Sequence, residues 1–149
     1  MALRIVRLGS KRTASEGLRI GTVRRPPRGV RKSEYASRDF YDVWLPTLAP
    51  SPTTIRLAQR ATNARDWTRF RKQYRAEMAS AANRATLDLL AALSHRTNLS
   101  VGCYCQDESH CHRAELRALL RERGAKLKQT RCGYRQEKKT KGAIGTLCC

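Results

Sequence analysis

The sequence has few acidic residues and no long apolar segment. Its 149 residues include 12 Asp and Glu against 31 Lys and Arg, which gives a formal net charge of +19 at pH 7. No apolar run approaches the roughly 20 residues that a membrane-spanning helix needs. The first residues alternate arginine with apolar side chains, whereas a signal peptide carries a continuous apolar block. We therefore expect a cytoplasmic protein with no membrane partner.

Disulfide bonds are not expected either, although the chain contains six cysteines. Small secreted proteins use such numbers of cysteines to build disulfide scaffolds. Because the sequence begins without a secretory signal, we interpret these cysteines as reduced thiols. The length predicts a single domain that is large enough to enclose its own hydrophobic core.

The positive charge gathers at the two ends of the chain. Residues 1–32 hold ten Lys and Arg with one acid, and residues 125–149 hold seven with one acid. Such ends attract polyanions, so nucleic acid is a candidate partner through non-specific electrostatic attraction. Apolar periodicity fades after Gly124. We therefore predict a domain over residues 1–124 and a mobile basic tail over residues 125–149.

Hydrophobic periodicity predicts an α/β fold. Apolar runs favour strands, and apolar residues that recur every three or four positions favour helices, with Trp67, Phe70 and Tyr74 facing the core of one of them. The predicted strands are residues 3–8, 18–23 and 99–105, and the predicted helices are residues 52–61, 64–80, 83–95 and 115–123. We expect a small, mainly parallel sheet flanked by helices in a single three-layer domain, followed by the basic tail.

The densest group of reactive side chains follows the strand predicted at residues 99–105. Residues 103–113 read CYCQDESHCHR and contain three thiols, two imidazoles and a guanidinium. Side chains alternate along a strand, so Cys103 and Cys105 should face the same side. Cys111 should lie where the next helix begins, and there the helix dipole favours a thiolate.

A second group of charged residues follows the strand predicted at residues 18–23. Arg24, Arg25 and Arg28 lie in a loop that contains two prolines and a glycine. If the two strands are parallel neighbours, both loops open at the same edge of the sheet, where α/β proteins bind ligands. We expect these arginines and Arg113 to form an anion-binding pocket together with the thiols and His112.

Several of these stretches carry a resemblance to a known family. They are RRPPRGV at residues 24–30, WLPTLAPS at 44–51, WTRF at 67–70, YRAE at 74–77, CYC at 103–105 and CHR at 111–113. In this order they resemble the DUF488 family of uncharacterised bacterial proteins. The resemblance covers about residues 17–124 and implies a compact α/β domain without naming a reaction.

The residues are compatible with an enzyme that acts on a phosphate- or carboxylate-bearing substrate, for example a nucleotide-like molecule. Arg24, Arg28 and Arg113 would bind the anion, Cys103 or Cys111 would be the nucleophile, and His112 the general base. Because the spacing matches no phosphatase or protease signature, the type of reaction stays open.

Two other interpretations use the same residues differently. Cys103, Cys105 and Cys111 with His110 or His112 offer enough ligands for a tetrahedral zinc ion, although their spacing differs from the usual two-residue gaps. Alternatively, the thiols fill space as small apolar side chains, and the basic ends make the chain a non-catalytic nucleic-acid accessory module. The sequence itself identifies no cofactor.

Overall fold

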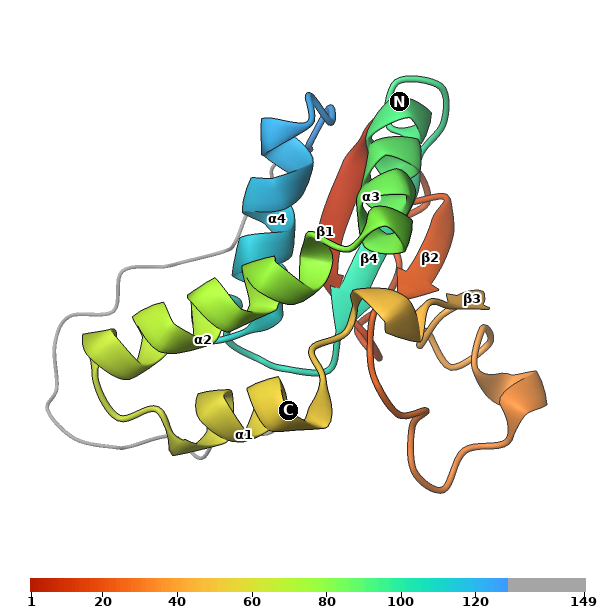
Figure 1. Ribbon diagram of the computed structural model, residues 1–149. Helices are drawn as coiled ribbons and strands as arrows, with labels where there is room; N and C mark the ends of the chain where they lie inside the picture. Colours follow the sequence, from red (N-terminus) through yellow and green to blue (C-terminus); the bar gives the residue numbers. More distant parts are fainter. Residues whose placement is uncertain (129–149) are drawn as a thin grey trace, which may run out of the picture.

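The computed structural model describes residues 1–128, and within them four parallel strands form one sheet in the order β1-β4-β2-β3 (Figure 1). The strands are β1 (Leu3–Arg7), β2 (Leu18–Gly21), β3 (Val43–Trp44) and β4 (Leu99–Cys103). β2 lies directly beside β4, with Leu18 opposite Leu99 and Gly21 opposite Gly102. The strands predicted from apolar runs are therefore present, and so is the parallel pairing on which the predicted pocket depends.

The helices lie close to their predicted positions. They are α1 (Pro52–Arg60), α2 (Ala64–Met78), α3 (Ala81–Leu93) and α4 (His112–Glu122), with two short 3-10 helices, η1 (Lys32–Glu34) and η2 (Pro46–Leu48). Ser51 caps α1, because its side chain accepts a hydrogen bond from the Thr54 amide and Pro52 takes the first helical position. α4 begins three residues before its predicted start, directly after Cys111.

The main hydrophobic core lies between one face of the sheet and the helices α2, α3 and α4 (Figure 1). Alternate side chains of the strands point to this face, as the two-residue period requires. The core includes Leu3, Ile5, Ile20, Leu99 and Val101 from the strands, and Tyr74, Met78, Leu87, Leu90, Leu116, Leu119 and Leu120 from the helices. Trp67, Phe70 and Tyr74 are all buried, as their helical spacing predicts.

The opposite face of the sheet is covered by irregular chain. Tyr41, from the irregular segment between η1 and β3, packs directly on β2. A Cβ atom on Gly21 would come within 2.4 Å of the Tyr41 ring, so only glycine permits this contact. Arg19 of β2 is also buried on this face and pairs with Glu16. This loop layer, together with the sheet and the helices, completes an α/β domain.

The described part of the chain ends beside β1. The Leu3 amide donates to the Lys126 carbonyl, and the Lys128 amide donates to the Leu3 carbonyl. The remainder of the predicted basic tail, with Cys132, Cys148 and Cys149, lies outside the described residues. Within residues 1–128, every helix is too short or too polar to cross a bilayer.

Candidate functional site

A cavity of about 1050 Å³ opens at the carboxyl ends of β2 and β4. These strand ends point toward α1 (Figure 1), and the cavity lies among the loop after β2, the start of α1 and the end of β4. It is lined by Val23, Arg24, Arg25, Pro26, Pro27, Arg28, Phe40, Pro50, Pro52, Ile55, Arg56, Gln59, Cys103, Tyr104 and His112. Two loops that are far apart in the sequence therefore share one hollow, at the edge of the sheet where the predicted pocket was placed.

The arginines of this cavity differ in what they contact. Arg25 and Arg28 are exposed, whereas the half-buried Arg24 donates to the carbonyls of Ala49 and Pro50. Arg24 thus holds the loop against the start of α1 as well as lining the cavity. Arg56 adds a guanidinium from α1 that sequence reasoning missed. The path of α1 past the strand ends brings it there, and the helical pattern alone does not reveal that path.

Arg113 is placed differently from its prediction. Arg113 is buried, as Cys103 and His112 are, but unlike them it is not among the residues that line the cavity. Its Nη2 donates to the Cys105 carbonyl at 2.6 Å, which ties the loop after β4 to the first turn of α4. In the structure Arg113 therefore holds this loop, and its contact with a bound anion stays a prediction.

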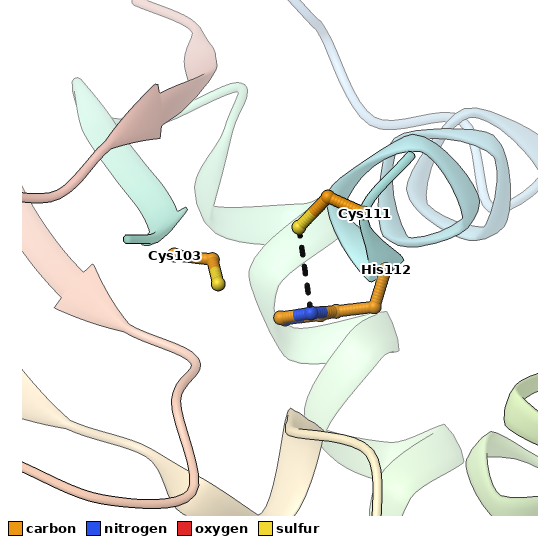
Figure 2. Close-up of side chains that lie close together, drawn as sticks. All are labelled: Cys103, Cys111 and His112. Carbon is orange, nitrogen blue, oxygen red and sulfur yellow. Dashed lines mark hydrogen bonds between the residues drawn. The ribbon is translucent and has the colours of Figure 1, made fainter. Parts of the chain in front are cut away.

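Cys103, Cys111 and His112 form a buried thiol–imidazole cluster (Figure 2). Cys103 comes from the end of β4, and Cys111 and His112 come from the start of α4. One potential ligand atom from each lies within 4.8 Å of the others. The Cys111 Sγ lies 3.7 Å from the His112 Nδ1, and the Cys105 Sγ lies 3.6 Å from the Cys103 Sγ. The predicted shared orientation of Cys103 and Cys105 is therefore present.

The ring of His112 is held by groups around it. Its Nε2 lies 2.9 Å from the Thr22 carbonyl oxygen. Because a carbonyl only accepts, Nε2 carries a hydrogen and donates a hydrogen bond to that oxygen. In the neutral ring the lone pair then lies on Nδ1, on the side of Cys111. The Tyr74 ring packs against the imidazole with its centroid 5.6 Å away. One ring nitrogen therefore faces the Thr22 carbonyl and the other faces the Cys111 sulfur.

Electrostatics couples the members of the cluster. Contact with the Cys105 and Cys111 sulfurs, together with burial, raises the pKa of Cys103 well above its ordinary value. Burial disfavours a charge on His112, but the Cys103 and Cys111 sulfurs outweigh burial and raise the pKa of His112 to about 10. The His112 imidazole opposes this effect, because its positive charge and its contact with Cys103 lower the pKa of that thiol.

His110 and Trp44 lie apart from this cluster. His110 is exposed, and its Nδ1 is 2.6 Å from the Asp107 carboxylate while its ring lies against Trp67. It is thus not brought to the thiols, and His112 is the imidazole that is. Trp44 is 45% exposed, and its Nε1 donates to the Val23 carbonyl at 2.8 Å, where the arginine loop begins.

Comparison with known proteins identifies the family of this domain. The family model described as the active DUF488-N3 subclade matches residues 3–124, which is most of the chain. The chain belongs to the DUF488 family. The resemblance found in the ordered motifs is thereby confirmed. No curated protein and no solved structure gives a significant match. The matched residues include all those that line the cavity. The family description names no reaction, so the chemistry of the cavity has to be inferred from its residues.

Proposed function

We propose that this DUF488 protein is an enzyme that binds a small phosphate-bearing, nucleotide-like substrate in the cavity at the strand ends. The proposal rests on one observation: the basic loop after β2 and the residues Cys103 and His112 line the same hollow. An anion held by the loop would lie beside the thiol–imidazole cluster. The description of the matching subclade as active is in keeping with catalysis.

Unpaired positive charge supports the binding of an anion. Within residues 1–128, the side chains of Arg25, Arg28 and Arg56 form no ion pair with a carboxylate. A guanidinium binds phosphate oxygens through two parallel hydrogen bonds, which favours phosphate over a simple halide ion. These three arginines are therefore available to an external ligand.

The rest of the lining supports a ligand with an apolar or aromatic body. Pro26, Pro27 and Ile55 supply apolar surface, and the rings of Phe40 and Tyr104 lie edge to face with centroids 6.1 Å apart. Binding pockets for organic ligands combine such walls with a few polar groups that fix orientation. A nucleotide, with a flat base and a phosphate, matches this combination.

The reacting centre in this proposal is the thiol–imidazole cluster. Cys103 and His112 line the cavity and would contact the substrate, whereas Cys111 lies behind them at the start of α4. Arg113 acts as a positioning residue, since it holds the Cys105 carbonyl and through it the loop that joins the two parts of the cluster. Arg24 positions the opposite loop in the same way.

Binding is tested by calorimetric titration with adenosine monophosphate (AMP), with adenosine as the probe that lacks phosphate. We expect AMP to bind more tightly than adenosine. The double variant Arg25→Ala, Arg28→Ala should weaken AMP binding at least about tenfold, because charge-assisted hydrogen bonds contribute about 1.5–3 kcal/mol each. The matched control is Arg65→Ala, Arg69→Ala, which removes equal charge from the exposed face of α2. An equal loss of affinity in both variants would show general attraction to positive charge and contradict the pocket.

Turnover is tested separately by phosphorus NMR of a mixture of nucleotides incubated with the protein. We expect new phosphorus resonances to grow with time in the wild type and to be absent with Cys103→Ser. A wild type that binds AMP but leaves every nucleotide unchanged would contradict catalysis while preserving the binding pocket.

The exposed basic residues around the cavity favour a second candidate, a nucleic-acid accessory module without catalysis. The segment from β2 to the start of η1 exposes Arg25, Arg28, Arg31 and Lys32. Further lysines follow residue 128 in the sequence. Such a module would bind DNA with a strong dependence on salt. The test replaces Lys138, Lys139 and Lys141 with glutamine in the full chain. If the protein is such a module, this variant should bind DNA more weakly. If the protein is an enzyme that uses the cavity, the variant should keep its affinity for AMP.

A further inference from the structure

The thiol–imidazole cluster has the dimensions of a tetrahedral metal site. Zinc binds thiolate sulfur at about 2.3 Å and imidazole nitrogen at about 2.0 Å, so a sulfur and a nitrogen on one tetrahedral ion lie roughly 3.6 Å apart. The Cys111 Sγ and the His112 Nδ1 lie 3.7 Å apart, and the Cys103 donor completes a set within 4.8 Å. All three side chains are buried, at the end of β4 and at the start of α4.

The hydrogen bond of His112 is the kind that metal-binding histidines make. Such a histidine donates its distal N–H to a backbone carbonyl or carboxylate, which fixes the ring and the tautomer. The His112 Nε2 is 2.9 Å from the Thr22 carbonyl, which leaves Nδ1 as the nitrogen that faces the Cys111 thiol. The Thr22 hydroxyl in turn donates to the Gly102 carbonyl of β4, which anchors the residue that holds the ring.

We propose that Cys103, Cys111 and His112 bind one Zn²⁺ ion, with a fourth coordination position that opens into the cavity. Cys103 and His112 line the cavity directly, so an ion between them has access to a bound substrate. Three protein ligands with one open position are typical of catalytic zinc, whereas structural zinc is closed by four. The open position takes water or an oxygen of the substrate, and the ion acts there as a Lewis acid.

Cys105 is the residue that distinguishes an open site from a closed one. Its sulfur lies 3.6 Å from that of Cys103, but it falls outside the set of donors that all lie within 4.8 Å of one another. In this proposal it packs beside the ligands without joining them. The proposal is independent of substrate binding, since metal content is measured without any substrate.

The first experiment measures zinc in the full-length chain, purified without a histidine tag or chelator. The background variant is Cys132→Ser, Cys148→Ser, Cys149→Ser, which removes the thiols that lie beyond the described residues. We expect close to one zinc per chain in this background, a loss of most of it with Cys103→Ser or Cys111→Ser, and retention with Cys105→Ser. A zinc-free wild type that also binds no added Zn²⁺ would overturn the proposal, as would zinc that disappears in the background variant.

A second measurement needs no substitution in the cluster and therefore does not depend on whether the variants fold. X-ray absorption of the zinc-loaded background variant reports the atoms bound to the metal. We expect two sulfurs together with lighter nitrogen and oxygen ligands. Three sulfur ligands would contradict the proposal that one coordination position is open. A metal with no sulfur ligand would contradict the proposed site altogether.

Discussion

Two groups of arginines in this molecule differ in how their charge is balanced. On the loop-covered face of the sheet, Arg19 is fully buried and pairs with Glu16, and Arg12 pairs with Asp42 at 2.7 Å. At the cavity, Arg25 and Arg28 are exposed and, within residues 1–128, pair with no carboxylate. The first group has its counterions inside the fold, and the second group does not.

This difference separates stability from function. Burying a guanidinium is costly unless a carboxylate and further hydrogen bonds satisfy it. Arg19 meets that condition, because it also donates to the carbonyls of Ser10 and Asp39. Arg25 and Arg28 remain hydrated and contribute little to folding, so their charge is available to a ligand. The net charge of the chain therefore does not by itself indicate which arginines bind anions.

The largest effect should come from Glu16→Gln, which leaves the Arg19 charge buried without its counterion. We expect the free energy of unfolding to fall by about 3 kcal/mol or more, as when one partner of a buried ion pair is removed. Urea denaturation followed by circular dichroism measures this. The control is Glu34→Gln, which removes one partner of the exposed Arg38 pair and should cost less than about 1 kcal/mol. If both variants lost the same free energy of unfolding, the buried ion pair would contribute no more to stability than the exposed one, which would contradict this comparison.

The contribution of Glu16 should also depend on pH. Burial alone would raise the pKa of Glu16, but hydrogen bonds from Arg19 and Ser100 outweigh burial and lower the pKa below its ordinary value of 4.5. Because the pKa is lower in the folded state, this stabilisation is complete above 4.5 and is lost as the pH falls through the folded-state value. The difference in unfolding free energy between wild type and Glu16→Gln should therefore shrink on acidification. A difference that stays constant down to about pH 2 would contradict the pairing.

A smaller effect is expected from Trp44→Phe, which removes the hydrogen bond to the Val23 carbonyl. One neutral hydrogen bond contributes about 1 kcal/mol, and the exposed position of the ring limits the remaining loss. Since Val23 precedes the arginine loop, the affinity for AMP should fall by a few-fold as well. Thermal unfolding and calorimetry measure the two effects, and unchanged AMP affinity would show that this hydrogen bond does not position the loop.

The smallest effect on stability should come from the double variant Arg25→Ala, Arg28→Ala. Exposed side chains without ion pairs change the free energy of unfolding by less than about 0.5 kcal/mol each when they are replaced. The same variant should lose AMP binding, and this contrast with Glu16→Gln separates the two groups of arginines. A loss of stability comparable to that of Glu16→Gln would mean that these arginines are structural.

Much of the fold could be predicted from the sequence because its signals are local. Ser51 and Pro52 mark the start of α1, and the recurrence of Trp67, Phe70 and Tyr74 marks the buried face of α2. β3 was not predicted, because two residues are too few to show alternation. Its place at the edge of the sheet depends on pairing with β2, which is a tertiary contact.

The site could be predicted only in outline. The position of Cys103 and the arginine loop at two strand ends, together with parallel pairing, was sufficient to expect one shared pocket. The inward turn of Arg113 toward the Cys105 carbonyl and the approach of Arg56 from α1 depend on how α4 and α1 pack. Which histidine lies beside the thiols also depends on tertiary structure. The start of α4 places His112, and not His110, next to Thr22 and the cysteines.

The central claim is that the loop after β2 and the loop after β4 bind one ligand together. It is tested most directly by following the backbone amide resonances of the labelled protein by NMR during titration with AMP. We expect resonances of Arg24, Arg25 and Arg28 to shift together with those of Cys103 and His112, with a single dissociation constant. Shifts confined to one of the two loops, or to the exposed face of α2, would contradict a shared site.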